Sequence, residues 1–563
     1  MKKLNKVAGF ETHSGEKNDF NTPCVHYAVM FVVCFFSFFV NNQVIPADLM
    51  ESRNLATAQE MVQKGNYLLP TMNGEPRLEK PPLPTWIAAE IEIVFPGNLV
   101  AQRCATGLVG TLMVVFLYLL VFRLTRNRLI GLMASLVLAS CFNVIIMART
   151  ATWDIYCHSF MLGAIYFMIS AFEQKGSQWK NFIFAGIFLG LSFLGKGPVS
   201  FYALFLPFII SYFIVYRPKV SNKGIPLTAM IVICLVISCW WTLYVYFFHR
   251  DTALYVAVKE SSSWINRNVR PWYYYWQFPA EAGIWALFLV TSLVGYFVNK
   301  KPEFRKEYTF SIIWFLASLV LLSVIPEKKT RYLLPILIPG AMLVAFYLYH
   351  SFKGLNSMRE KLFFRINTIL IAAILIAIPF VLYLMFYKES QLSLVLLILS
   401  TVISWSLSAY LFYSLFGTKG IRVMPVFTAI ILTMVMVEVL CLIPVGHLFI
   451  NEERHSIRMV HENTNIQGLP FYYNQDEELR IELVYEANQV IRPINLSHDS
   501  IYNNMPFVLL SGCPIDSLFD GRNVNIEHIG TFDNNWRKTG HKRYNWNLVR
   551  EVAIIRSNSP SGR

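Results

Sequence analysis

About thirteen apolar stretches recur along the chain, and most of them approach the length that an α-helix needs to cross a bilayer. A membrane-spanning helix needs about 20 mostly apolar residues. The stretches are Tyr27–Ile45, Leu99–Phe122, Leu129–Met147, Trp153–Phe172, Phe182–Leu194, Pro198–Tyr216, Pro226–Phe248, Phe278–Val298, Phe310–Ile325, Tyr332–His350, Ile366–Phe386, Leu392–Leu415 and Val423–Phe449. The sequence therefore predicts an α-helical polytopic membrane protein with about thirteen transmembrane helices.

The composition excludes a soluble enzyme of this length. Of the 563 residues, 55% are hydrophobic and 15% are charged, whereas a soluble chain carries about 25% charged residues. The formal net charge of +14 would suit either a nucleic-acid partner or cationic loops beside a membrane. Acidic and basic residues nearly balance from Asn451 onward, so the surplus lies among the apolar segments. We therefore expect a lipid bilayer, and no nucleic acid, as a partner.

Short basic connectors alternate with connectors of mixed charge, and this alternation predicts the orientation of the chain. Cytoplasmic loops carry an excess of Lys and Arg. The basic connectors hold Lys2, Lys3, Lys6, Arg123, Arg126, Arg128, Lys175, Lys180, Arg217, Lys219, Lys223, Lys300, Lys301, Arg305, Lys306, Lys353, Arg359, Lys361, Arg365, Lys419 and Arg422. With these and the N-terminus in the cytoplasm, an odd number of spans places the C-terminal tail outside. The N-terminal segment shows no short signal peptide, so we expect the first span to stay as an uncleaved anchor.

Two long polar segments lie on the outward side. In the connector 46–85, apolar residues at helical spacing followed by Gly65 and Pro70 predict an amphipathic helix at the membrane interface. The tail is long enough for one small domain, and the runs Leu479–Tyr485, Phe507–Leu510 and Val552–Ile555 predict strands of a mixed α/β module. We expect a transmembrane domain over 1–450, which includes the loop 46–85, and a soluble α/β domain over 451–563.

Acidic and basic side chains gather at the outward ends of several predicted spans. Ionisable groups at membrane depth are costly unless they are paired or hydrated, so they mark functional sites. These residues are Asp48, Glu51, Arg53, Glu79, Lys80, Asp154, Lys196, Glu327, Lys328, Lys329, Arg331 and Tyr332. Mixed charges at one membrane face predict a polar reaction chamber, and the same pattern would also suit the mouth of a transporter.

Each of these residues also has a purely structural interpretation. Lys196 and Arg331 would snorkel toward lipid headgroups. Asp48 and Asp154 would cap helix N-termini, a common role of Asp. The aromatic run from Trp272 to Trp276 is more typical of an interfacial belt than of a sugar-binding platform.

A set of motifs spread over the first ten predicted spans resembles a known family. The motifs are Glu51-Ser-Arg53-Asn-Leu-Ala56, Glu60-Met61, Gly65-Asn66, Pro70, Gly74, Glu79-Lys80-Pro81-Pro82-Leu83, Trp86, Arg103, Asp154, Lys196, Pro271-Trp272-Tyr273-Tyr274 and the run from Lys328 to Pro335. Together they resemble the GT-C glycosyltransferases that use a polyprenyl-phosphate-sugar donor. The similarity is in particular to the bacterial 4-amino-4-deoxy-L-arabinose lipid A transferases, relatives of the protein O-mannosyltransferases.

The resemblance implies an inner-membrane glycosyltransferase that moves a sugar from an undecaprenyl-phosphate carrier to an envelope acceptor on the periplasmic side. Lipid A or a related lipid is the favoured acceptor, and a protein hydroxyl is the alternative. The implied catalytic residues are Asp48, Glu51, Lys80 and Asp154. The implied donor-phosphate ligands are Lys196, Arg331, Tyr332, Arg53 and Arg103, and the implied substrate-binding residues are Glu79, Glu260, Trp272 and Tyr273.

Physical chemistry makes these assignments reasonable. Breaking the bond between the sugar C1 and the phosphate oxygen leaves charge on the phosphate, and cations held ready for that charge lower the barrier. A hydroxyl acceptor needs a general base, whereas a phosphate acceptor is already ionised. The carboxylates would act as that base or would hold an aminosugar cation. A lipid donor explains why such an enzyme lies in the membrane, and we expect it to act as a monomer.

The sequence departs from the family pattern at two positions. The family has adjacent Asp and Glu where this chain has Met50 and Glu51, so Asp48 would supply the missing acid one helical turn earlier. The aminoarabinose transferases have His after the loop glutamate, here Glu260, whereas this chain has Ser261. The sequence thus indicates no definite cofactor, and a divalent metal ion stays an open question.

Two other classes of protein compete with the enzyme. A lipid-carrier flippase or transporter would show inverted repeats and broken helices near the bilayer midplane, and the sequence indicates neither. A structural or polymer-length-regulating membrane protein would not need acids and cations at several outward helix ends.

Overall fold

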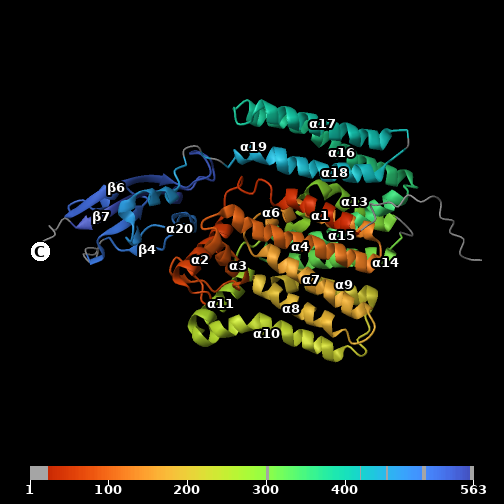
Figure 1. The fold of residues 1–563 in the computed structure, drawn as a ribbon, viewed down its shortest axis with the longest axis horizontal. Helices are drawn as coiled ribbons and strands as arrows, with labels where there is room; N and C mark the ends of the chain where they lie inside the picture. The colour runs from red at the N-terminus through yellow and green to blue at the C-terminus, as the bar shows by residue number, and fades with distance from the viewer. Residues whose placement is uncertain are drawn as a thin grey trace, which may run out of the picture.

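The helical part of the chain forms one layered bundle, and a small β-sheet domain projects from one end of it (Figure 1). The computed structural model describes residues 23–298, 303–418, 420–449, 451, 454–496 and 503–557. The helices of the bundle are α1 (Pro23–Phe38), α4 (Leu99–Thr125), α5 (Arg128–Ala139), α6 (Phe142–Ala148), α7 (Asp154–Glu173), α8 (Trp179–Lys196), α9 (Leu206–Tyr216), α10 (Gly224–Phe248), α13 (Ala286–Val298), α14 (Arg305–Val324), α15 (Leu334–Lys353), α16 (Met358–Leu382), α17 (Leu394–Phe416), α18 (Val423–Met436) and α19 (Leu442–Gly446).

Every one of the thirteen predicted spans contains a helix, but the number of complete spans is not confirmed. Among the described residues, eight helices are long and apolar enough to cross a membrane, and up to ten if each of two bent pairs counts as one span. α1 and the helical segment Phe201–Tyr216 are shorter than the others. The fold class is confirmed as α-helical and polytopic.

The bent pairs owe their shape to identifiable breaks. α5 and α6 meet at 68°, and the segments Trp272–Glu281 and Gly283–Gly295 meet at 101°. Gly283 has φ of 63°, and a Cβ at this position would lie 2.9 Å from Cβ of Phe142. Only glycine satisfies both the positive φ and the close approach.

The outward loop contains α2 (Leu49–Lys64), the hairpin β1 (Thr71–Met72) and β2 (Glu75–Pro76), and α3 (Leu83–Val94). The predicted helix is present and ends at Gly65, whose φ is 65°. It does not lie at a lipid interface, because polar as well as apolar side chains along it are buried against α3 and the tail. The hairpin was not predicted from the sequence, although Asn73 and Gly74 both take the positive φ that a two-residue hairpin turn favours.

The tail folds around a five-stranded mixed sheet, which confirms the predicted α/β module. The strand order is β4-β3-β5-β7-β6; β3 pairs in parallel with β4 and β5, and β7 pairs antiparallel with β5 and β6. The elements are β3 (Phe471–Asn474), α20 (Ile481–Ala487), β4 (Ile491–Ile494), β5 (Phe507–Ser511), α21 (Ile515–Leu518), β6 (Val524–Asp533) and β7 (Val549–Ser557). The domain boundary at residue 450 stays a prediction.

One strand prediction in the tail is wrong. The run Leu479–Tyr485 forms most of α20 instead of a strand. Leu483, Val484 and Ala487 are buried in the core that the tail shares with α2. Their spacing of one and four residues is that of a helix face, and a short apolar run does not reveal this period without its partner.

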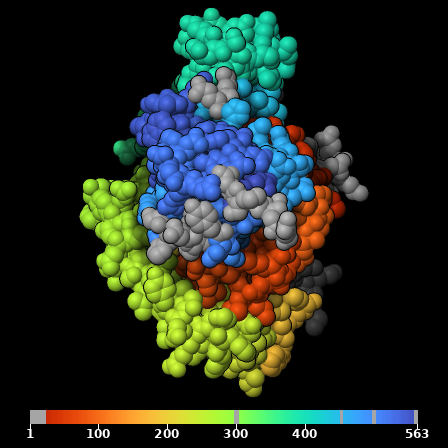
Figure 2. Space-filling model, turned by 90° about the vertical axis from the view of Figure 1, so that its left-hand side faces the viewer, coloured from red at the N-terminus to blue at the C-terminus, as the bar shows by residue number. Residues whose placement is uncertain are grey.

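The tail is fixed on the outward loop, not suspended beyond it. The Asn73 side chain donates to the carbonyl of Ile491 (2.8 Å) and accepts from the Ile491 N–H (2.7 Å). The Gln63 amide donates to the Asn488 side chain (2.9 Å). Figure 2 shows the tail, in blue, covering the red and orange loop segment, with the α10–α11 region beside it. This end of the molecule is therefore built by the loop and the tail together.

Candidate active site

The centre of the site is a buried ion cluster at the outward ends of three helical segments. Asp154 is the first residue of α7, Lys196 is the last residue of α8, and Arg331 lies just before α15. The Lys196 ammonium donates to Asp154 Oδ1, and Arg331 Nε lies 4.0 Å from Asp154 Oδ2. Asp154 is 1% exposed and Lys196 is 6% exposed. Helix polarity favours this arrangement, because an anion suits a helix N-terminus and a cation suits a C-terminus.

The segment before α15 adds a second pair to the cluster. Lys329 Nζ lies 2.5 Å from Glu327 Oε1. The ammonium groups of Lys196 and Lys329 lie 5.0 and 5.5 Å from the centre of the Tyr332 ring, and Cζ of Arg331 lies 5.9 Å from it. Three cations thus surround one aromatic ring. Glu327 and Lys329 were predicted among the charged residues at outward helix ends, but no catalytic or binding role was predicted for either.

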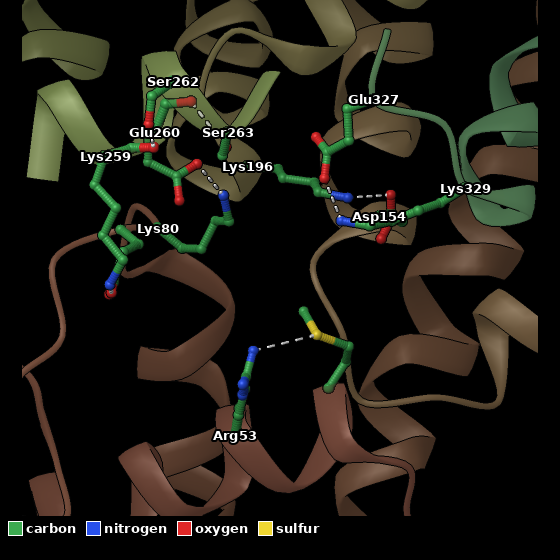
Figure 3. A network of polar contacts seen from close by, with 12 residues as sticks. Arg53, Lys80, Asp154, Lys196, Lys259, Glu260, Ser262, Ser263, Glu327 and Lys329 are labelled. Carbon is green, nitrogen blue, oxygen red and sulfur yellow. Dashed lines mark hydrogen bonds and ion pairs between the residues drawn. The ribbon is translucent and has the colours of Figure 1, made fainter. Parts of the chain in front are cut away.

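Adjacent residues of the proline-rich loop pair with adjacent residues of α11 (Arg250–Asn266). Lys80 Nζ lies 2.8 Å from Glu260 Oε2, and Lys259 Nζ lies 3.0 Å from Glu79 Oε1 (Figure 3). Burial opposes ionisation of Glu79, but the hydrogen bond from Lys259 and the charge of Arg77 outweigh it and hold the pKa of Glu79 below its ordinary value.

This loop lies directly against the central ion cluster. Cζ of Arg77 lies 5.2 Å from the ring centre of Trp153, the residue before Asp154. Cγ of Pro81 lies 4.0 Å from the position that a Cβ on Gly197 would take, directly after Lys196. The side chains of Lys80 and Lys196 are seen in the same close view (Figure 3). The loop and the ends of α7 and α8 therefore form one wall.

A cavity of about 270 Å³ opens beside the cluster. It is lined by Asp48, Ile146, Met147, Thr150, Thr152, Lys329, Thr330 and Arg331. We call this cavity, together with Asp154, Lys196 and Glu327, the charged chamber. Asp154 Oδ2 and Arg331 Nε are buried and have no hydrogen-bond partner among the described residues. The two atoms lie 4.0 Å apart, too far for a hydrogen bond. Because buried polar atoms are almost always paired, Arg331 Nε is a donor from which a substrate oxygen could accept a hydrogen bond.

An apolar pocket of about 40 Å³ adjoins the chamber. Its lining is His158, Val199, Tyr202, Ala203, Trp264, Tyr275, Leu322, Ile325, Glu327 and Tyr332. Glu327 and Tyr332 belong to the same connector as Lys329 and Arg331, so this pocket joins apolar side chains between helices to the charged groups. Such a lining suits the first units of a hydrocarbon chain whose charged end lies in the chamber.

Asp48 lines the chamber while it also caps a helix. Its carboxylate accepts the backbone N–H of Glu51 (2.7 Å) at the start of α2. The capping interpretation and the position in the chamber are therefore both observed. The Asp48 side chain is exposed, so it is accessible to a substrate in the chamber.

Glu51 and Arg103 are engaged with one another instead of facing the chamber. Two hydrogen bonds of 2.8 and 2.6 Å join Arg103 to Glu51, and both side chains are at most 2% exposed. Arg103 also donates to the carbonyls of Asn42 (2.5 Å) and Ile45 (2.6 Å), and Glu51 accepts the N–H of Ala151 (2.8 Å). We propose that this pair holds α1, α2 and α4 together and does not bind phosphate.

The remaining predicted site residues are Arg53, Trp272 and Tyr273. Arg53 Nη1 lies 4.0 Å from Met50 Sδ and projects toward the chamber (Figure 3). Burial and then the charge of Arg267 lower the pKa of Arg53. Trp272 and Tyr273 are 61% and 54% exposed and pack on one another, as expected for an interfacial belt. From the same aromatic run, Tyr275 accepts the N–H of Lys329 (3.2 Å).

The described residues contain no group of three or more His, Cys, Asp or Glu side chains that could hold a metal ion. Glu260, the position that raised the question, is neutralised by Lys80 instead.

Comparisons with known proteins concern the fold and the kind of relatives that the chain has. Residues 79–242 match the family model described as dolichyl-phosphate-mannose-protein mannosyltransferase. An uncharacterized protein of Aquifex aeolicus is 30% identical over 330 residues, which are 58% of this chain and 64% of that protein. The undecaprenyl phosphate-alpha-4-amino-4-deoxy-L-arabinose arabinosyl transferase 1 of Pseudomonas fluorescens (strain Pf0-1) is 26% identical over 359 residues, 60% of each chain. The chain thus spans about three fifths of the length of these relatives.

Among solved structures, ArnT of Cupriavidus metallidurans bound to undecaprenyl phosphate superposes with a TM-score of 0.68. The match has 17% identity and covers 96% of this chain and 98% of that one. The apo form of the same protein gives a TM-score of 0.63 at 18% identity.

The fold and the charged chamber define a polytopic membrane protein with GT-C architecture and a small C-terminal sheet domain. More particularly, the chain resembles the polyprenyl-phosphate-sugar-dependent transferases of the aminoarabinose and O-mannosyl type, as the sequence motifs predicted.

Proposed function

We propose that the protein is a membrane glycosyltransferase that moves a sugar from an undecaprenyl-phosphate-linked donor to an envelope acceptor. The observation that carries this proposal is the buried Asp154 carboxylate between Lys196 and Arg331, with unpartnered polar atoms, at the point where a charged chamber meets an apolar pocket. An amphiphile with a phosphate head and an isoprenoid tail has the shape and charge that these two spaces match. The names of the relatives support the same donor class.

The chamber can perform the reaction with the chain's own side chains. Lys196, Lys329 and Arg331 provide positive charge for the donor phosphate. The bond between the sugar C1 and the phosphate oxygen breaks, and the electron pair stays on the phosphate, where these fixed cations stabilise it. An acceptor oxygen forms the new bond at C1. A hydroxyl acceptor gives its proton to a carboxylate, for which Asp48 is the exposed candidate, whereas a phosphate acceptor has no proton to lose.

Asp154 serves mainly to position the cations. It is almost fully buried, and it holds Lys196 directly and Arg331 at 4.0 Å. A carboxylate at this position keeps two like charges close together without a phosphate present. Lys80 lies in the same close view as Lys196 (Figure 3), and Glu260 balances its charge.

We further propose that the acceptor is lipid A or a related lipid on the periplasmic side of a bacterial inner membrane. In this orientation the N-terminus is cytoplasmic and the tail is periplasmic, because basic connectors mark the cytoplasmic face. Arg123, from one of these connectors, pairs with Glu173 at the opposite end of α7 from Asp154. The tail packs on α2, whose N-terminal cap Asp48 lines the chamber. We expect the protein to act as a monomer.

Protein O-glycosylation is the alternative that a specific observation favours, since the family model over residues 79–242 is described by that activity. The two acceptors are distinguished with purified full-length protein and a radiolabelled undecaprenyl-phosphate sugar. Label in extracted lipid A, absent with Asp154→Ala, supports the proposal. Label in a hydroxyl-bearing peptide alone would replace it with the alternative, and label in neither acceptor with a panel of donor sugars would contradict both.

A further inference from the structure

A separate cavity lies at the end of the bundle opposite to the charged chamber. It has a volume of about 100 Å³ and is enclosed by α13, α14, α15 and α16. α15 has 20 residues, so its ends lie about 30 Å apart at 1.5 Å per residue, which is the thickness of the bilayer core. Arg331 precedes the first turn of α15, whereas His350 lies in its last turn and lines this cavity. A ligand here would therefore lie at the other membrane face from the chamber.

The walls of the cavity are mostly apolar and are contributed by all four helices. The lining residues are Val290, Thr291, Val294, Gly295, Tyr308, Tyr347, His350, Arg359, Glu360 and Phe363. Gly295 leaves part of the space open, because a Cβ added there would meet the Tyr347 ring only at 3.6 Å, an ordinary contact distance. The cavity therefore has room for a hydrocarbon chain and a point at which a larger side chain would fill it.

Basic side chains lie at the mouth of the cavity and beside it. Glu360 is already engaged, because it accepts two backbone N–H groups at the start of α16 (3.0 and 3.1 Å) and lies 3.4 Å from His350 Nε2. Arg359 is exposed and has no carboxylate partner in the part of the chain that the structure describes. Lys353, at the end of α15, lies over the Tyr349 ring, 5.4 Å from its centre, and lines a smaller neighbouring cavity that shares Tyr308 and His350 with this one and also contains Glu303. Arg359 and Lys353 are therefore the two cations available to a ligand. The Glu360 carboxylate is already hydrogen-bonded at the start of its own helix.

We propose that this cavity binds an anionic membrane phospholipid, with one acyl chain between the helices and the phosphate on Arg359 and Lys353. An apolar cavity between membrane helices with basic residues at its mouth has the chemistry of an anionic-lipid site. The bound lipid would fill the space between four helices and stabilise the end of the bundle that lies away from the chamber. This inference does not depend on the proposed transferase activity, because its ligand does not reach Asp154.

The test uses full-length protein in detergent with phosphatidylglycerol or phosphatidylcholine of the same acyl chains, read by native mass spectrometry. We expect wild type to retain at least fivefold more phosphatidylglycerol than phosphatidylcholine and to melt at a higher temperature with the former. Arg359→Gln should abolish this preference, and Gly295→Phe should lower retention of both lipids. Lys175→Gln is the matched control, because Lys175 is an exposed lysine on another basic connector and does not line the cavity.

Equal retention of the two lipids by wild type would overturn the proposal. So would an equal loss of preference in Lys175→Gln, since that would reduce the effect to net charge. If Gly295→Phe does not fold, the comparison of Arg359→Gln with Lys175→Gln still decides the outcome.

Discussion

Asp154 and Lys196 form a buried ion pair across the ends of two neighbouring helices, α7 and α8. These helices pack along one another, and their opposite polarity at the outward face places an anion at an N-terminus and a cation at a C-terminus. Arg331 approaches the other oxygen of the same carboxylate from a third segment. The carboxylate thus keeps two cations together at a place where neither would be stable alone.

Substitutions of Asp154 and Lys196 should affect the stability of the protein and its sugar-transfer activity differently. Lys196→Met leaves a buried carboxylate with Arg331 alone, and losing one partner of a buried pair costs about 3–5 kcal/mol. We expect a lowered melting temperature and a loss of sugar transfer of at least about 100-fold. The double variant Asp154→Asn/Lys196→Met should regain much of the stability and none of the activity. Wild-type turnover in the double variant would exclude both residues from the reaction.

Lys80 and Lys259 offer a matched comparison, because each pairs with one carboxylate on the opposite segment. The Lys80 side chain is 25% exposed and that of Lys259 is 50% exposed. Exposed ion pairs contribute about 0–1 kcal/mol, so Lys259→Ala should change turnover less than about threefold. Lys80→Ala should reduce turnover by about two orders of magnitude while the protein still inserts in the membrane. Equal effects of the two substitutions would argue against a role for Lys80 at the donor.

The alkaline limit of activity should depend on Lys329. Burial lowers the pKa of this lysine, and the hydrogen bond to Glu327 offsets only part of the effect. The protonated form is the one that binds phosphate, so affinity falls as pH rises through the lowered pKa, before an ordinary lysine near 10.4 would lose its charge. Lys329→Arg keeps its charge at all these pH values and should move the decline upward. Donor KM measured from pH 7 to 10.5 checks this, and identical profiles would rule out Lys329 as the titrating group.

Asp48→Asn isolates the chemical role of Asp48 from its capping role. Asn caps a helix about as well as Asp does, so the melting temperature should stay within experimental error. Loss of the negative charge should lower turnover at least about tenfold, as expected for a general base or for a ligand of an aminosugar cation. Unchanged turnover would leave Asp48 as a helix cap only.

Glu51→Gln tests the structural assignment of the buried pair with Arg103. The substitution removes the charge that satisfies a buried guanidinium, so we expect a loss of about 3–5 kcal/mol in unfolding free energy. Turnover per folded molecule should stay within about threefold of wild type. Glu90→Gln is the control, because Glu90 is exposed on α3 and should change neither quantity. A stable but inactive Glu51→Gln would restore the predicted catalytic role of Glu51.

Sequence patterns predicted local features well when one element alone determined them. The helices follow from apolar length, Gly65 ends α2 as expected, and Asp154 opens α7. The run Leu479–Tyr485 was misassigned because α20 shows its buried face only where it packs on α2. The number of complete spans stays unconfirmed, since several apolar helices among the described residues are short or bent within the bundle.

The candidate site was predicted in its composition but not in its pairings. Charged residues at outward helix ends were identifiable because such groups are rare near a membrane. Their partners were not identifiable, since Glu51 lies 52 positions from Arg103 and Lys80 lies 180 positions from Glu260. Glu327 and Lys329 were recognised as charged residues of their connector, but only the folded chain places their pair beside Tyr332.

The sequence by itself determined that this is a membrane protein, the class of its fold and the kinds of charged group available at one membrane face. These properties follow from hydrophobicity and from local spacing, and both depend only on residues that are close together in the chain. The tertiary structure decided which carboxylate meets which cation, and hence which charges are neutralised within the framework and which stay open to a substrate. Electrostatic energy depends on distance and burial, and in this protein both are set by helices that are far apart in the sequence.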